Sequence, residues 1–86
     1  MDLAKLVLEK KEVQFIAKND IGYEVMVHLL PTRLGYTVNR YGLGSTDTEY
    51  LFLWEVQEEL QKYSDIRITG TWFYPTTKDF AQKLLH

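Results

Sequence analysis

The sequence predicts a two-layer α+β domain, in which an antiparallel sheet of about four strands carries helices on one face, in the order α-β-β-β-α-β-α. Two observations favour this fold class. Apolar and polar residues alternate along three segments between residues 12 and 41, and again along residues 66–74, as half-buried strands require. Between them, residues 46–63 carry apolar side chains at helical spacing. With 86 residues and no linker, the chain has room for one domain over residues 1–86.

The first half should form a short helix followed by a three-stranded meander. Asp2 can cap a helix that begins at Leu3, because its carboxylate can accept from free backbone amides of the first turn. Strands are expected over residues 12–17, 23–29 and 36–41. The turns between them contain Asn, Asp, Pro and Gly, which suit tight turns, and short connections favour antiparallel pairing of neighbours.

The second half should form a long helix, a fourth strand and a last helix. Thr46 and Glu49 match a capping box, so we expect the long helix to run from Thr46 to about Tyr63. Its apolar stripe, which should pack on the sheet, consists of Phe52, Leu53, Val56, Leu60 and Tyr63. Residues 66–74 are rich in strand-forming residues. The apolar face of the last helix is formed by Phe80, Ala81, Leu84 and Leu85.

Composition argues against most kinds of active site. The chain has no cysteine, which removes thiolate nucleophiles, disulfides and thiolate metal sites. Its two histidines, His28 and His86, are isolated, and its serines, Ser45 and Ser64, lie at the two expected termini of the long helix. Glu55 and Glu59, which are four residues apart and share a face, belong to the solvated surface of the long helix. We therefore expect no enzymatic activity, no metal and no cofactor.

Charge and hydropathy suggest a soluble cytoplasmic protein. The formal net charge is −2, without the basic surplus typical of nucleic-acid binders. The longest apolar run, residues 50–54, is far shorter than the ~20 residues of a membrane span. The N-terminal residues lack the pattern of a signal peptide.

One short motif points to a known family. Gly42-Leu43-Gly44-Ser45 precedes the expected long helix and follows three strands. The order α-β-β-β-α with this glycine turn, over residues 2–63, resembles the double-stranded-RNA-binding domain. In that family lysines after the turn bind phosphates across the groove. Here those positions are Thr46, Asp47, Thr48 and Glu49. The resemblance therefore implies the topology and not the RNA-binding activity.

Two surfaces could bind a partner. The first consists of Tyr50, Leu51 and Trp54, which lie off the apolar stripe of the expected helix. Either the last helix covers these side chains as part of the core, or they are exposed and form an interface, since Trp and Tyr dominate binding hot spots.

The second surface is the outer face of the sheet. It should carry Met26, His28, Thr37, Asn39, Tyr41, Arg67, Thr69, Thr71 and Phe73. Tyr41, Arg67 and Phe73 supply the aromatic and cationic groups that bind a protein or stack on single-stranded nucleic acid. The alternative is an ordinary solvated sheet face.

The sequence therefore favours a small non-enzymatic protein-binding module, such as a regulator, inhibitor or accessory protein of the kind that phages and bacteria encode. Its partner is expected to be a protein. The alternative is a nucleic-acid-binding domain that uses the aromatic residues of the sheet with Arg33, Arg40 and Arg67. The identity of the partner and the oligomeric state stay open at this point.

Overall fold

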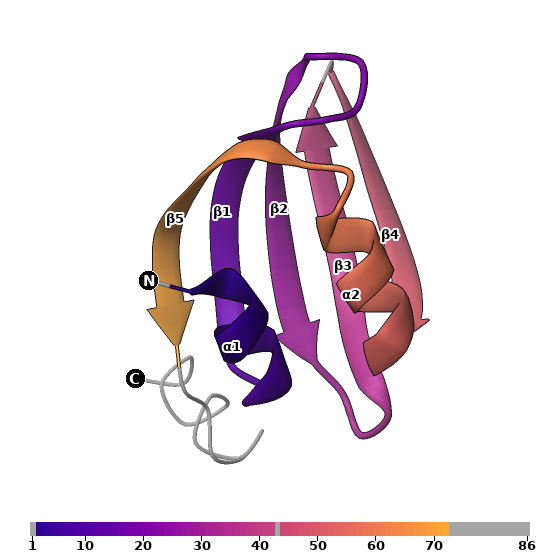
Figure 1. The fold of residues 1–86 in the computed structure, drawn as a ribbon. Coiled ribbons are helices and arrows are strands. Elements are labelled where there is room, and N and C mark those ends of the chain that lie inside the picture. The colour runs from indigo at the N-terminus through magenta and orange to yellow at the C-terminus, as the bar shows by residue number, and fades with distance from the viewer. Residues whose placement is uncertain (1, 43, 73–86) are drawn as a thin grey trace, which may run out of the picture.

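The computed structural model describes residues 2–42 and 44–72. The elements, in chain order, are α1 (Leu3–Leu8), β1 (Glu12–Lys18), β2 (Glu24–Pro31), β3 (Gly35–Gly42), β4 (Ser45–Phe52), α2 (Leu53–Leu60) and β5 (Ser64–Trp72). The five strands form one antiparallel sheet in the order β4-β3-β2-β1-β5, and both helices lie against the same face of it (Figure 1). The α+β class is confirmed, with one strand more than expected. The expected last helix and Phe73 lie outside the described residues.

The meander predicted from the alternating pattern is confirmed. Strands β1, β2 and β3 pair in sequence, with Val13 opposite Leu29 and Leu29 opposite Val38. These three side chains are fully buried, because they share the sheet face that the helices cover. Among the described residues, the core cluster is Leu3, Val7, Val13, Phe15, Ala17, Val27, Leu29, Tyr36, Val38 and Val56. Burial of each larger apolar side chain contributes about 1.5–3 kcal/mol, so this one-sided core is the main source of stability.

Helix α1 begins as the sequence predicts. The Asp2 carboxylate accepts a hydrogen bond from the Ala4 amide at 3.1 Å, and Leu3 and Val7 enter the core. The helix is tied to the sheet by Tyr36, whose hydroxyl donates toward the carbonyl oxygens of Val7 and Lys11 at 3.1 and 2.9 Å. Burial raises the pKa of Tyr36 to about 12. The phenol is therefore a neutral donor that holds α1 on β3.

The expected long helix is wrong over residues 46–52, which form β4. The two faces of β4 are formed by alternate residues, Thr46, Thr48 and Tyr50 on one and Asp47, Glu49 and Leu51 on the other. This period of two is typical of a strand, but the same residues also match a capping box, on which the helix prediction is based. Pairing with β3 satisfies the backbone along eight residue pairs, which outweighs the local preference for a helix start. Helix α2 therefore begins at Leu53, where the Glu55 side chain accepts from the Phe52 amide at 2.9 Å. With β4 in place of the helix, the topology departs from that of the double-stranded-RNA-binding domain.

A glycine allows β4 to reach the end of β3. A Cβ atom on Gly35 would overlap the Leu51 carbonyl oxygen and lie 2.7 Å from the Cα atom of Phe52. Only the absence of a side chain lets the two backbones approach this closely. Gly35 thereby sets the position of the last residues of β4 and the start of α2.

Strand β5 crosses to the far edge of the sheet and pairs with β1 (Figure 1). The pairing contains a register shift: Gln14 lies opposite Gly70, while the next residue, Phe15, lies opposite Ile68. The extra residue, Thr69, forms a bulge, and its hydroxyl donates to the Gln14 carbonyl at 3.1 Å. Beyond the bulge, the residues of β5 that the alternation assigned to the outer face lie on the face that the helices cover. Thr71, expected on the outer face, is therefore in register with the buried Val13.

Candidate functional site

Large apolar side chains are exposed together where β4 ends and α2 begins. Leu34, in the turn between β2 and β3, is 67% exposed, and Tyr50, Phe52 and Trp54 are 81%, 52% and 58% exposed. We call these four residues the β4–α2 corner. Leu34 lies in a turn and Tyr50 and Phe52 lie in β4, so the fold brings these three to one hollow. Trp54 follows in the first turn of α2.

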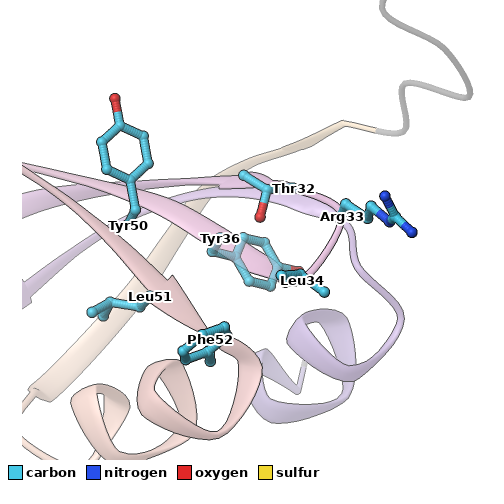
Figure 2. Close-up of a pocket in the computed structure, with 7 residues that line it drawn as sticks. All are labelled: Thr32, Arg33, Leu34, Tyr36, Tyr50, Leu51 and Phe52. Carbon is cyan, nitrogen blue, oxygen red and sulfur yellow. The ribbon is translucent and has the colours of Figure 1, made fainter.

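A hollow of about 380 Å³ lies at this corner. It is lined by Thr32, Arg33, Leu34, Tyr36, Tyr50, Leu51 and Phe52 (Figure 2). In Figure 2 the side chains of Leu34, Tyr36 and Phe52 lie close to one another, while Arg33 extends away from them. Tyr50 and Leu51 leave β4 on opposite sides of the strand, as neighbouring strand residues must. The hollow is therefore an open, mainly apolar depression at the end of the sheet.

The turn that carries Leu34 is held from both sides. The Lys10 ammonium group donates to the carbonyl oxygens of Thr32 and Gly35 at 2.5 and 3.0 Å. The Gly35 amide donates to the Thr32 hydroxyl at 3.1 Å, and the Thr32 amide donates to the Gly35 carbonyl at 2.8 Å. These bonds fix the turn backbone, so Leu34 is presented from an ordered support.

A second, acidic groove adjoins the hollow. It has a volume of about 230 Å³ and is lined by Glu49, Leu51, Trp54, Glu55, Glu58, Glu59 and Lys62. Leu51 lines both depressions, which places the groove directly beside the apolar hollow. Four carboxylates and one ammonium group line the groove, so its potential is negative.

Arg40 joins the groove to the sheet. From β3 its guanidinium group contacts Asp47 and Glu49 of β4 at 2.5 and 2.7 Å, and Glu59 of α2 at 2.7 Å. The Tyr63 hydroxyl donates to the same Glu59 carboxylate at 2.6 Å. A single guanidinium thus holds carboxylates from two elements and locks α2 against the edge of the sheet.

These contacts determine the protonation of Glu59 and Tyr63. Burial alone would raise the pKa of Glu59, but hydrogen bonds from Arg40 and Tyr63 outweigh it and bring the pKa below its ordinary value of 4.5. Burial and the hydrogen bond to Glu59 raise the pKa of Tyr63 well above its ordinary range. At neutral pH Glu59 is therefore a charged anchor and Tyr63 a neutral donor, which suits a structural role better than proton transfer.

The structure separates the residues of the first predicted surface. Tyr50 and Trp54 are exposed, as an interface requires. Leu51 is half-buried and packs against the core, because in a strand it lies on the side opposite Tyr50 and faces α2. Of the expected stripe, Val56 is buried, and Leu53, Leu60 and Tyr63 are partly buried against the core. The helix ends at Leu60, so Tyr63 follows it, and Phe52 precedes it and is exposed, contrary to expectation.

The residues of the second predicted surface lie elsewhere. Arg67 lies opposite Ile16, which lies opposite Met26, which in turn lies opposite Tyr41. Tyr41 and Arg67 therefore share one row across the outer face of the sheet, away from the corner. Both are exposed.

Two of the three arginines named for the nucleic-acid alternative have carboxylate partners. Arg40 lies on the helix-covered side of the sheet, bound to three carboxylates, and Arg67 contacts Glu24 at 2.9 Å. A phosphate would have to displace these partners, which weakens the case for a nucleic-acid surface.

Leu34 was missed by the sequence analysis, as was the exposure of Phe52. The available signal for Leu34 is an apolar residue between Pro31 and Gly35, in a turn where polar residues are usual. For Phe52, the signal is the alternation of Thr46, Thr48 and Tyr50, which marks a strand.

Other kinds of site find no support in the described part of the chain. There, no group of three or more His, Asp or Glu side chains is arranged to hold a metal ion. None of the helices in residues 2–42 and 44–72 has the length and apolar character needed to cross a membrane. No protein-family model, curated protein or solved structure matches this chain.

Proposed function

We propose that this protein is a small non-enzymatic protein-binding module whose contact surface is the β4–α2 corner. The observation that carries the proposal is the exposure of Leu34, Tyr50 and Phe52 around a mainly apolar hollow, with the exposed Trp54 lining the adjoining groove. Monomers seldom expose contiguous apolar surface without a use for it, and aromatic residues supply much of the energy of protein interfaces. The cysteine-free sequence fits a reducing compartment, so we place this activity in the cytoplasm.

The support beneath the corner favours binding without large rearrangement. Tyr50 and Phe52 extend from a paired strand, and Trp54 lies in the first turn of a helix locked by Arg40. The turn bearing Leu34 is fixed by Lys10. Side chains held on ordered backbone lose less conformational entropy when they bind, which raises affinity for a given contact area. The nucleic-acid alternative has less support, because Arg40 and Arg67 already contact carboxylates.

A comparison of three baits tests the proposal. The tagged wild-type chain, the double variant Leu34→Ser/Tyr50→Ser and the control Ile21→Ser are each incubated with an extract and the captured proteins are compared by mass spectrometry. Ile21 is 70% exposed in the turn between β1 and β2, at the opposite end of the sheet (Figure 1). We expect the same proteins on the wild type and the control, and their loss from the double variant.

Two outcomes of this comparison would contradict the proposal. One is capture of the same proteins by all three baits. The other is capture that disappears after nuclease treatment, which would favour the nucleic-acid alternative. Far-UV circular dichroism of each bait shows that a loss of capture is not a loss of folding.

A further inference from the structure

Strand β4 is a long, regular edge. It pairs with β3 through eight consecutive residue pairs without a register shift, and in the described part of the chain it is the last strand on its side of the sheet. An edge strand presents a row of backbone amide and carbonyl groups to which another extended chain can bind. The opposite edge, β5, is less regular, because its pairing with β1 contains register shifts.

The features that usually protect an edge are mostly missing from β4. It contains neither Lys nor Pro, and its pairing contains no bulge. It does carry two acidic residues, Asp47 and Glu49, opposite Arg40 and the buried Val38 on the side that faces α2. Acidic side chains at such positions disfavour an apolar strand, which would remove water from them and add no cation to the one Arg40 guanidinium group that they share.

Charge selects the occupant of this edge. Asp47, Glu49 and Glu59 share the single guanidinium group of Arg40. Glu59 has a second cationic partner, the Lys62 ammonium group, at 3.6 Å. Glu55 and Glu58 add two more carboxylates to the groove, with the exposed Trp54 beside them. A second copy of this chain would bring the same carboxylates to the interface and be repelled. A segment with Lys or Arg would instead be attracted, and its cation could lie on the Trp54 ring.

We propose that the free edge of β4 binds an extended, basic segment of a partner protein as an added strand, with a Lys or Arg side chain in the acidic groove beside Trp54. This deepens the proposed function, on which it rests, by stating the chemistry of the partner. Side chains on one face of a strand are two residues apart. A basic residue opposite Asp47 or Glu49 therefore places an alternate residue opposite Leu51, next to the apolar hollow. The segment should thus alternate basic residues with one apolar residue at the end.

Short synthetic peptides test this directly. The probes are Lys-Thr-Lys-Thr-Leu-Thr and its reversed order, which covers both strand directions, with Glu-Thr-Glu-Thr-Leu-Thr and its reversed order as acidic controls. Binding to the ¹⁵N-labelled full chain is followed by amide shifts in NMR spectra. We expect one basic peptide to shift amides of β4 and α2 while those of the turn at residues 19–23 stay in place, and we expect no shifts with the acidic controls. Its affinity should fall as salt rises.

Backbone pairing is separated from side-chain contact by N-methylation. Two versions of the binding peptide are methylated on alternate amides, one on each edge of the peptide strand. Strand addition requires that one version loses binding and the other retains it, since only one edge donates to β4. Equal binding by both versions would overturn the added-strand geometry.

Variants locate the groove. Glu58→Gln should weaken the basic peptide about two- to fivefold, as expected for one exposed ion pair, whereas Glu9→Gln, exposed at the end of α1, should have no effect. Failure of both basic peptides to bind at millimolar concentration, or equal binding of acidic and basic peptides, would overturn the inference. Capture of partners through Leu34 and Tyr50 would then still uphold the proposed function, so the two results are distinguishable.

Discussion

Arg40 and Glu59 show how two polar residues organise this corner of the molecule. From the sequence, Arg40 is expected in a strand and Glu59 on the solvated face of a helix. In the structure the Arg40 Nε atom lies 2.7 Å from Glu59 across the interface between β3 and α2, and Glu59 is buried. Removal of one partner from such a buried pair leaves the other without compensation, so the pair should affect stability more than its exposed neighbours do.

We expect Glu59→Gln to lower the free energy of unfolding by about 1.5–3 kcal/mol, the range for a hydrogen bond to a charged group. The matched control is Glu58→Gln, whose side chain is exposed one position earlier, and which should change stability by less than about 0.5 kcal/mol. Urea denaturation of the two variants measures both values. Equal losses would show that the Arg40 contact does not hold α2 in place.

The same residue predicts a dependence on pH. Because the folded-state pKa of Glu59 lies below its ordinary value of 4.5, ionisation of Glu59 stabilises the fold above that pH. This stabilisation is lost as the pH falls from 4.5 through the folded-state pKa. The difference in unfolding free energy between wild type and Glu59→Gln should therefore narrow as the pH falls below 4.5. If the difference in unfolding free energy stays constant as the pH falls below 4.5, the lowered pKa of Glu59 is contradicted.

At the scale of elements, the boundary between β4 and α2 decides which residues are exposed. A helix from Thr46 would place Leu51 almost opposite the buried stripe, but in β4 it lies opposite the buried Tyr36 and packs on the core. The strand ends at Phe52 and α2 begins at Leu53, so Trp54 lies in the first helical turn with most of its side chain in solvent.

This boundary gives a simple comparison of two variants. Leu51→Ala should cost about 1–2 kcal/mol, less than the 2–5 kcal/mol of a fully buried leucine, because the side chain is half-buried. Trp54→Ala should cost less than about 0.5 kcal/mol, since an exposed side chain loses little packing. Chemical denaturation of both variants side by side decides between the strand and the helix. A larger loss for Trp54→Ala would favour the helical assignment.

At the scale of the whole molecule, the return of β5 links distant parts of the chain. β1 lies between β2 and β5, so a strand near the N-terminus pairs with a strand that begins at Ser64. The helices then cover a single core that includes Leu3 and Val7 near the N-terminus, and Ile68 of β5 packs against it. Contacts between residues so far apart in sequence form together with the core rather than in a separate unit.

We therefore expect one cooperative unfolding transition. Far-UV circular dichroism reports the sheet and helices, and tryptophan fluorescence reports the surroundings of single residues. The two thermal curves should have the same midpoint, because a two-state domain loses all its structure at once. Two separate midpoints would show that part of the chain unfolds on its own.

The candidate site was predictable only in part. Tyr50 and Trp54 stood out from the sequence as aromatic residues off a helical stripe, and both are exposed. Leu34 and Phe52 did not, because their exposure depends on the position of a turn and on the end of a strand. The role of Arg40 also depends on β4 and α2, which bring its carboxylate partners to it.

The sequence by itself determined the cap of α1, the meander of β1 to β3 and the presence of β5. These features are encoded locally: a period of two marks the buried face of a strand, and turn residues such as Asn19 and Gly22 mark where the chain reverses. Residues 46–52 match both a capping box and a strand, and the capping box led to the wrong prediction of a helix. The tertiary structure makes this segment a strand and not a helix, because its backbone pairs with β3. The close approach of the two backbones at Gly35 permits this pairing. The exposed corner, its acidic groove and the place of β4 at the edge of the described sheet all follow from that long-range pairing.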